Sequence, residues 1–157
     1  MSARSGLSPV PVDPARSDED GVLADDVSFL LARANALSLS AGNAALAPFG
    51  LRVRSYSVLA LAVGGARPSQ RDLAEYLRLD PSQVVSLVDD LQKRGLVVRE
   101  PDPADRRANV VVATDAGERA FDEARRAAQE AERREHAALT AEERSQLADL
   151  LRKIAFP

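Results

Sequence analysis

Cysteine is absent from the 157 residues of this chain, and histidine occurs once, at His136. Without cysteine there is no disulfide, no thiolate nucleophile, no thiol redox sensor and no Cys-based zinc site. A single histidine also excludes a metal site built from several histidines of one chain. His136 lies in a charged helical segment, and no serine lies in a nucleophile-elbow sequence. We therefore predict no enzymatic activity, no cofactor and no bound metal.

Aromatic residues are scarce at 4%, tryptophan is missing, and no long hydrophobic run occurs. A core must therefore be built from Leu, Val and Ala. No stretch approaches the roughly 18 apolar residues that cross a bilayer, and the N-terminus has no basic segment followed by a hydrophobic one. These absences predict a cytoplasmic protein.

An excess of basic charge is missing too, because the formal net charge is −3. The usual electrostatic footprint of a nucleic-acid binder is therefore absent, and any such function must depend on local geometry. The composition is otherwise that of a globular chain, with 45% hydrophobic and 29% charged residues. One domain with a tail is the expected organisation.

The tail is predicted over residues 1–20, where Pro9, Pro11 and Pro14 stand among small and acidic residues. Such a segment buries too little apolar surface to order itself. From Leu23 to about Ala47, apolar residues recur at three- and four-residue spacing, which predicts an amphipathic helix ended by Pro48-Phe49-Gly50. A second helix is predicted from about Arg52 to Val63.

Two short capped helices follow. Ser69-Gln-Arg-Asp72 is typical of a capping box, and Asp80-Pro81-Ser82-Gln83 combines an Asp N-cap with Pro at the first helical position and Gln at the third. Only Arg78-Leu79-Asp80 separates them, so they predict a helix-turn-helix. The β-branched runs Val97–Glu100 and Asn109–Ala113 come directly afterwards, and they predict a winged form.

Two more helices complete the prediction. Thr114-Asp115 opens one that runs to about Ala138, and its charges pair at i,i+4 as on a solvated face. Thr140 and Glu143 form a capping box for the last helix, which ends near Ile154. The expected fold class is mainly α with a small β-wing.

The second short helix has a polar outward face. Val84, Leu87, Val88 and Leu91 stand at i, i+3, i+4 and i+7 and predict an inward stripe. The outward face then carries short hydroxyl and amide groups that suit base edges in a major groove, with Val85 at its border. These polar residues are Ser82, Gln83, Ser86, Asp90 and Lys93. The alternative is a face that only meets solvent.

Between the predicted strands lies Pro101-Asp-Pro-Ala-Asp-Arg-Arg-Ala108, which is longer than a tight hairpin needs. Its two prolines restrict the backbone, and Asp105 is placed to bond nearby backbone or a neighbouring guanidinium. Arg106 or Arg107 would then be free to enter a minor groove. The alternative is a charged hairpin tip that contacts nothing.

Charge over the whole segment argues for modest non-specific affinity. Basic and acidic residues are equal in number from Arg67 to Ala113. Asp89 and Asp90 count against DNA binding, because either would repel phosphate if it pointed at the backbone, and Lys93 and Arg94 offset them only in part. Specificity must then come from a few placed contacts.

The chain resembles the MarR family of bacterial transcription regulators. The resemblance covers nearly everything after the tail, and the motif DPADRRA followed by a strand and Thr-Asp-Ala-Gly is its most specific part. It implies an obligate homodimer with intertwined first and last helices, and a repressor on a palindromic operator that a small, often aromatic or anionic, ligand releases. Residues 21–157 would form one such domain, in which 51–114 is the winged helix-turn-helix and 21–50 and 115–157 are dimerisation helices.

The resemblance also implies site residues. Arg107 matches a wing-tip arginine, Asp105 an acid that steadies the wing, and Arg99 a position that anchors a ligand carboxylate in some members, although a structural pair with Asp or Glu is the preferred reading. Where many members carry Arg, this chain has Ser86, which changes the expected base preference. The predicted DNA-binding residues are Ser69, Gln70, Arg71, Ser82, Gln83, Ser86, Lys93, Arg106 and Arg107.

Apolar surface gives the dimer separate support, since the outer helices carry more of it than a small winged core can cover. The preferred function is thus a homodimeric, sequence-specific DNA-binding regulator. The alternative is a winged-helix protein-interaction module that does not bind DNA.

Overall fold

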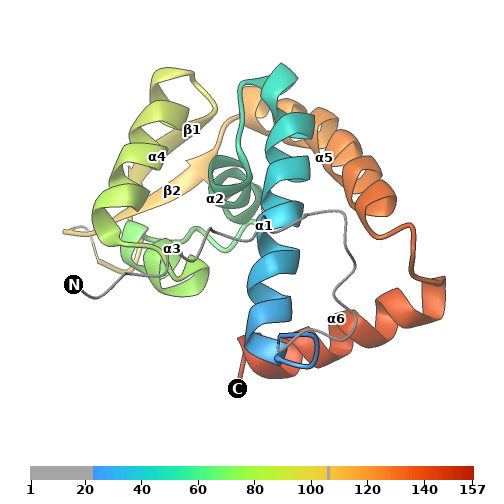
Figure 1. Cartoon of the computed structure of the whole chain (residues 1–157). Helices are drawn as coiled ribbons and strands as arrows, with labels where there is room; N and C mark the ends of the chain where they lie inside the picture. Colours follow the sequence, from blue (N-terminus) through green and yellow to red (C-terminus); the bar gives the residue numbers. More distant parts are fainter. Residues whose placement is uncertain (1–22, 106) are drawn as a thin grey trace, which may run out of the picture. The chain divides into compact units, whose positions relative to one another are not determined.

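The computed structural model describes residues 23–105 and 107–157 (Figure 1). The chain divides into two compact units between Asn35 and Ala36, and the second unit holds everything from the C-terminal part of the first helix onward. The predicted tail and Arg106 lie outside the described residues. The elements are α1 (Val27–Leu46), η1 (Ala47–Phe49), α2 (Val53–Val63), α3 (Gln70–Leu77), α4 (Pro81–Lys93), β1 (Val97–Pro101), β2 (Asn109–Ala113), α5 (Asp115–Glu135) and α6 (Ala141–Ala155).

The predicted fold class, mainly α with a small β-wing, is confirmed. Ser69 and Asp72 form the expected capping box of α3, and Thr140 and Glu143 form that of α6. Asp80 caps α4 as expected, since its carboxylate accepts from the Ser82 backbone N–H. Among the described residues, the Gln83 side chain takes no part in this cap. Local capping chemistry therefore sets most helix starts.

Two predicted helix bounds were wrong. The first helix begins at Val27 and not at Leu23, because the Asp26 carboxylate accepts from the Phe29 backbone N–H at 2.8 Å and starts the helix there. The fifth ends at Glu135 and not near Ala138. There the chain turns at His136, and the Arg144 guanidinium of α6 donates to the carbonyl oxygen of Leu139 at 2.6 Å.

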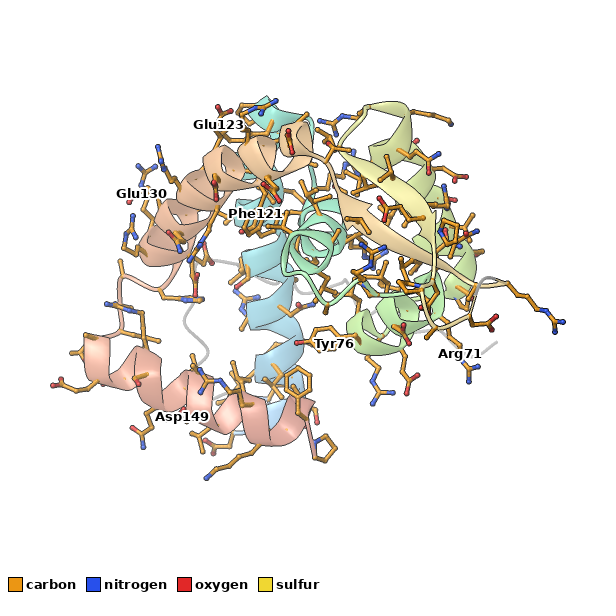
Figure 2. All side chains as sticks on the ribbon, turned by 180° about the vertical axis from the view of Figure 1, so that it is seen from behind. Arg71, Tyr76, Phe121, Glu123, Glu130 and Asp149 are labelled. Carbon is orange, nitrogen blue, oxygen red and sulfur yellow. The ribbon has the colours of Figure 1, made fainter. Side chains whose placement is uncertain are left out.

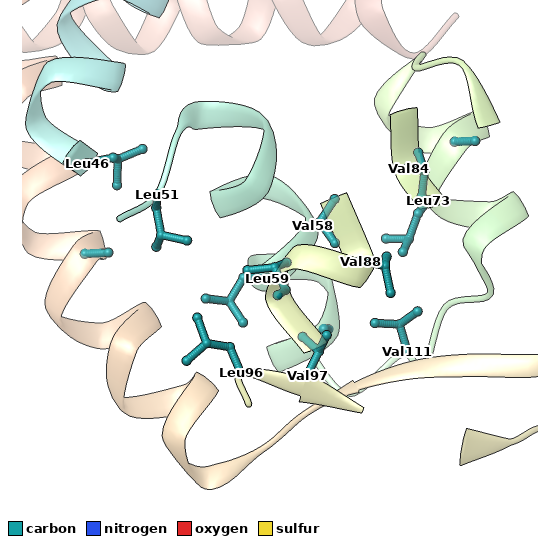
Figure 3. Close-up of a cluster of buried hydrophobic side chains, with 14 residues drawn as sticks. Leu46, Leu51, Val58, Leu59, Leu73, Val84, Val88, Leu96, Val97 and Val111 are labelled. Carbon is teal, nitrogen blue, oxygen red and sulfur yellow. The ribbon is translucent and has the colours of Figure 1, made fainter. Parts of the chain in front are cut away.

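The core lies in the second unit, where side chains of α2, α3, α4 and the wing meet (Figure 3). Val58 and Leu59 of α2 have no exposed surface, and the same holds for Leu73 of α3 and Val84 of α4. The core is aliphatic, as the composition predicts. It holds the back of α4 and leaves the opposite face of that helix in solvent.

The wing is an antiparallel pair of strands in which Val97 lies opposite Ala113 and Pro101 opposite Asn109. The residues just before α3, Pro68 and Ser69, pair with the free side of β2. The Val111 N–H donates to the Pro68 carbonyl at 2.8 Å, and Ser69 forms a bridge with Val110. This third contribution was not predicted, and it ties the start of α3 to the wing.

Gly117 allows α5 to lie directly against the chain before β1. A Cβ at this position would stand 2.0 Å from the Leu96 carbonyl oxygen. The Thr114 backbone N–H donates to the same Leu96 oxygen, and the Thr114 hydroxyl donates to the Gly95 carbonyl at 2.6 Å. Close backbone contact therefore explains the glycine of the Thr-Asp-Ala-Gly motif.

Within residues 23–105 and 107–157, no single helix has the length and apolar character to cross a bilayer. One pair of successive segments, Val27–Phe49 and Val53–Val63, satisfies the length and composition test together, with a bend of 69° between them. The second segment contributes Val58, Leu59 and Ala62 to the core.

Candidate nucleic-acid interface

Helix α4 presents a polar face because its apolar stripe is held in the core. Val84, Val88 and Leu91 are buried, and Leu87 is half-buried, as predicted. Asp80 begins the helix, and hydrogen bonds from the Ser82 hydroxyl and backbone lower the pKa of its carboxyl group. The N-terminal turn is thus fixed, which sets where the outward residues point.

The outward residues Ser82, Gln83 and Ser86 are all exposed. The Ser82 hydroxyl donates to Asp80, and the Ser86 hydroxyl donates to the Ser82 carbonyl at 3.1 Å. Within the described part of the chain, the Gln83 side chain has no hydrogen-bond partner. Val85 beside it is 40% exposed. The Gln83 side-chain amide is therefore available to hydrogen-bond another molecule.

Arg99 of β1 neutralises Asp89 of α4. Its Nη2 lies 2.6 Å from Asp89 Oδ1, and its guanidinium also donates to Gln70 Oε1 of α3 and to Gln92 Oε1 of α4. This single side chain joins both helices of the helix-turn-helix to the wing. Of the two expectations for Arg99, the structure shows the structural pair.

The N-terminal turn of α3 is largely engaged within the protein. The Ser69 hydroxyl donates to Asp72 Oδ2 and accepts from the Asp72 N–H, and these hydrogen bonds lower the pKa of the Asp72 carboxyl group. Gln70 accepts from Arg99. Arg71 is exposed, and its side chain makes no hydrogen bond or ion pair to any residue that the structure describes (Figure 2). Among the described residues, Arg71 is thus the cation of this turn that has no internal partner.

Two basic residues end α4 and behave differently. Lys93 is exposed and unpaired among the described side chains. Arg94 donates to the backbone carbonyl oxygens of Gly50 at 2.7 Å and Phe49 at 2.8 Å, which fastens the end of α4 to the turn before α2. Gly50 has φ of 65°, the left-handed conformation that glycine favours.

The wing tip is shaped by its aspartates. The Asp105 carboxylate accepts from the Arg107 backbone N–H at 3.0 Å, and Asp102 accepts from the Ala104 N–H at 2.8 Å. Arg107 is exposed. Asp105 therefore orders the backbone, the first of its two expected roles, and the Arg107 guanidinium forms no ion pair with another described residue.

Two ion pairs show which cations of this segment are engaged within the protein, and because each pair joins one base and one acid, the balance of charge is unchanged. Arg67 pairs with Glu100 at 2.6 Å, and Arg99 pairs with Asp89. The described cations left without an internal partner on α3, α4 and the wing include Arg71, Lys93 and Arg107. Among the described residues, cations thus remain without an internal partner on α4, which carries Gln83, and also on α3 and the wing.

Sequence reasoning missed what Arg94 and Gln70 do. Arg94 was read only as a partial offset to the two aspartates, and Gln70 as a DNA contact. Each makes its contact with a residue 29 or more positions away, as the pairs Arg99–Gln70 and Arg94–Gly50 show. The one available signal was the predicted helix end at Pro48-Phe49-Gly50, because the last carbonyl groups of a helix have no intrahelical partner.

Two capped helices, a buried stripe behind the second and an antiparallel wing define a winged helix-turn-helix protein. A family model described as "MarR family" matches residues 49–108. A MarR-family transcriptional regulator from Rhodococcus sp. RHA1 is 47% identical, with a TM-score of 0.82 over 86% of this chain and 96% of that one. The chain belongs to the MarR family of transcriptional regulators.

Two further solved structures are informative. CouR from Rhodococcus jostii RHA1, bound to p-coumaroyl-CoA, is 48% identical, with a TM-score of 0.79 over 86% of this chain and 95% of that one. BpsR from Bordetella bronchiseptica, whose DNA binding is regulated by 6-hydroxynicotinic acid, is 25% identical, with a TM-score of 0.77 over 85% and 96%. No curated protein matches the chain.

Proposed function

We propose that this regulator is a homodimeric repressor that binds a palindromic DNA site and leaves it when a small molecule binds. The observation that carries the proposal is the Arg99–Asp89 pair. It pairs Asp89, one of the two acids that count against DNA binding, with a wing arginine, and the same guanidinium ties α4 to α3 and the wing. Membership of a family of transcriptional regulators supports the same function.

Helix α4 would enter the major groove through Gln83, with Ser82 and Ser86 beside it. A glutamine amide pairs bidentately with adenine, whereas hydroxyl groups are less selective. The hydroxyl protons of Ser82 and Ser86 are used in hydrogen bonds to Asp80 and to the Ser82 carbonyl. Each hydroxyl oxygen can therefore accept from a base, but it can donate to one only after the hydroxyl group rotates. Base selectivity is thus expected to depend chiefly on Gln83.

Arg71, Lys93 and Arg107 would supply the electrostatic part of binding. We assign Arg71 and Lys93 to phosphate contacts and Arg107 to the minor groove. Arg106 is proposed as a second wing cation from sequence alone. Ser69 and Gln70 would orient the neighbouring residues that contact DNA. The Ser69 hydroxyl caps the start of α3, and the Gln70 side chain accepts a hydrogen bond from the Arg99 guanidinium.

A second copy of the chain would cover the exposed apolar residues of the outer helices. Helix α6 has no buried residue, and Leu150, Ile154 and Phe156 are 50%, 62% and 59% exposed. In α1, Val27 is 64% exposed. Apolar faces of this kind are normally covered by a partner, and a symmetric dimer matches a palindromic site.

The ligand class is proposed from the relatives. CouR, nearly half identical, is bound to p-coumaroyl-CoA, and BpsR responds to 6-hydroxynicotinic acid. We therefore expect an aromatic acid or its CoA thioester to release the repressor. Arg99 would not anchor it, since its guanidinium is occupied.

The test is fluorescence anisotropy of labelled DNA from the region upstream of the gene, with the wild type and three variants. Wild type should bind in the roughly nanomolar range at low salt and weaken steeply as salt rises. Arg107→Ala and Gln83→Ala should each bind about tenfold or more weakly, from the ~1–3 kcal/mol of one specific contact. Arg119→Ala, an exposed change on α5, is the matched control.

Equal affinity of all four proteins would remove α4 and the wing from the mechanism. Failure of the wild type to select any fragment from genomic DNA would favour a winged-helix interaction module that does not bind DNA.

A further inference from the structure

Helix α3 ends in a left-handed turn that holds an arginine. Arg78 has φ of 53° and ψ of 45°. The Leu79 N–H donates to the Ala74 carbonyl at 3.0 Å, a hydrogen bond that is common where a helix ends in this conformation. Glycine usually occupies such a position, because a Cβ is strained at positive φ. The backbone of the turn is therefore ordinary, and the residue in it is unusual.

A second arginine with positive φ has a partner within the protein. Among the described residues other than glycine, Arg67, with φ of 50°, and Arg78 have this conformation. Arg67 Nη2 lies 2.6 Å from Glu100 Oε2 of the wing. Arg78 is exposed, and its guanidinium makes no hydrogen bond or ion pair with a residue that the structure describes. Within the described part of the chain, no contact of the Arg78 side chain offsets the strain, and strained residues of this kind concentrate at functional sites.

Arg78 lies in the turn of the helix-turn-helix, two residues before the Asp80 cap of α4. Its neighbours Leu77 and Leu79 are partly buried and pack against the core, whereas Arg78 between them is exposed. The core thus holds the turn on both sides of the arginine. Gln83 follows three residues after the Asp80 cap, so Arg78 is next to the end of α4 that carries the proposed base contact.

The charges of this turn give the arginine a second reason to be there. Between residues 75 and 80 the acids are Glu75 and Asp80, and Arg78 is the one base. Asp80 is needed for the helix, because its carboxylate accepts from the Ser82 N–H at 2.8 Å and caps α4. Without a base beside them, these two acids would repel DNA phosphates from the start of α4.

We infer that the Arg78 guanidinium binds a phosphate of the DNA backbone beside the N-terminal end of α4. The inference rests on the DNA-binding function proposed above, and it adds a residue that the sequence pattern did not assign to DNA. The strain at Arg78 is offset by this contact only in the complex. A phosphate contact carries no base preference, so Arg78 positions α4 for the base contact of Gln83.

Fluorescence anisotropy at a series of salt concentrations tests the contact. The probes are a duplex that the wild type selects from genomic DNA and a shuffled duplex of the same length. Arg78→Gly should bind both about tenfold or more weakly, because a phosphate contact is independent of sequence. The slope of log Kd against log salt should fall by about 0.9 for each subunit bound. Arg78→Lys, which keeps the charge, should retain most of the affinity and the wild-type slope, and Arg119→Gln on α5 should change neither.

Thermal melting without DNA should give the opposite sign. Arg78→Gly removes a Cβ from a left-handed position, so its Tm should rise by about 2–5 °C while its DNA affinity falls. An arginine that only stabilised the turn would lower the Tm when removed, and its loss would leave the salt slope unchanged.

Three results would overturn the inference: an Arg78→Gly variant with the affinity and salt slope of the wild type, an Arg78→Gly variant with a lower Tm, or an Arg78→Lys variant that binds as weakly as Arg78→Gly. When the wild type binds its selected duplex, each of these results leaves the proposed function standing. A wild type that selects no duplex from genomic DNA contradicts the proposed function and the Arg78 contact together.

Discussion

Arg99 Nη2 lies 2.6 Å from Asp89 Oδ1, and the same guanidinium reaches Gln70 and Gln92. The Arg99 side chain is 23% exposed and that of Asp89 is 46% exposed. Because Arg99 is on the wing and its partners are on α3 and α4, this contact ties the three elements of the winged helix-turn-helix to one another.

Removing Arg99 should therefore affect both stability and DNA binding. Arg99→Gln leaves Asp89 unpaired and breaks the bonds to both glutamines, which should cost about 1–2 kcal/mol of unfolding free energy after allowing for solvent screening. Urea denaturation measures this, and anisotropy should show DNA affinity falling about tenfold. The matched control is Arg67→Gln, which breaks an ion pair whose two side chains are 41% and 44% exposed. Because both partners are exposed, this change should cost less than ~1 kcal/mol.

An Arg99→Gln variant that is as stable as Arg67→Gln and binds DNA like the wild type would contradict this prediction. The hydrogen bonds of Arg99 would then contribute neither to stability nor to DNA binding. Adding Asp89→Asn to Arg99→Gln should recover part of the lost DNA affinity, because it removes the unpaired negative charge.

Gly117→Ala should destabilise the winged domain. The new methyl group would meet the Leu96 carbonyl at 2.0 Å, and the contact is with backbone, which cannot move aside as a side chain can. Overpacking of this kind costs about 1–3 kcal/mol. Urea denaturation should show it, whereas Gly64→Ala, whose methyl group would be 3.5 Å from the nearest backbone oxygen, should change stability little. Equal stabilities of the two variants would contradict the close approach of α5.

Acid should weaken the helix caps. Hydrogen bonds lower the pKa of Asp72 and Asp80 at the starts of α3 and α4, and hydrogen bonds with Thr140 lower that of Glu143. A carboxyl group with a lowered folded-state pKa adds stability above its unfolded value, near pH 4, and that stability is lost as pH falls through the lower folded value.

Unfolding free energy should thus decline from about pH 4 downward, as measured by urea denaturation at a series of pH values. Asp80→Asn keeps a capping oxygen without an ionisable group, so its decline should be shallower. A decline identical to that of the wild type would show that the Asp80 cap has no part in acid sensitivity.

The apolar face of α6 should be required for the proposed dimer. Leu150→Asp places a charge on the face of α6 that also carries Ile154, one turn further along, and both side chains are exposed in the single chain. Burying that charge against a second copy would cost several kcal/mol, so sedimentation should show a shift to the monomer. Ser145→Asp, an exposed change on the same helix, should leave the dimer intact. A Leu150→Asp variant that still sediments as a dimer would place the interface elsewhere.

The sequence determined the parts of this protein that depend on neighbours along the chain. Ser69 with Asp72, Asp80 with Pro81, and Thr140 with Glu143 set where helices begin, because a cap is made within about one turn. The stripe of Val84, Val88 and Leu91 showed which face of α4 is outward, since helical period alone places these residues together.

Tertiary structure decided what the charged and amide side chains of that surface do. Gln70 and Arg99 are far apart in sequence, and only the packing of α3 against the wing makes the glutamine a support for the arginine. Arg94 likewise finds its carbonyl partners in a turn more than forty residues earlier. Long polar side chains choose partners by three-dimensional distance, whereas caps and helical faces are set by spacing along the chain.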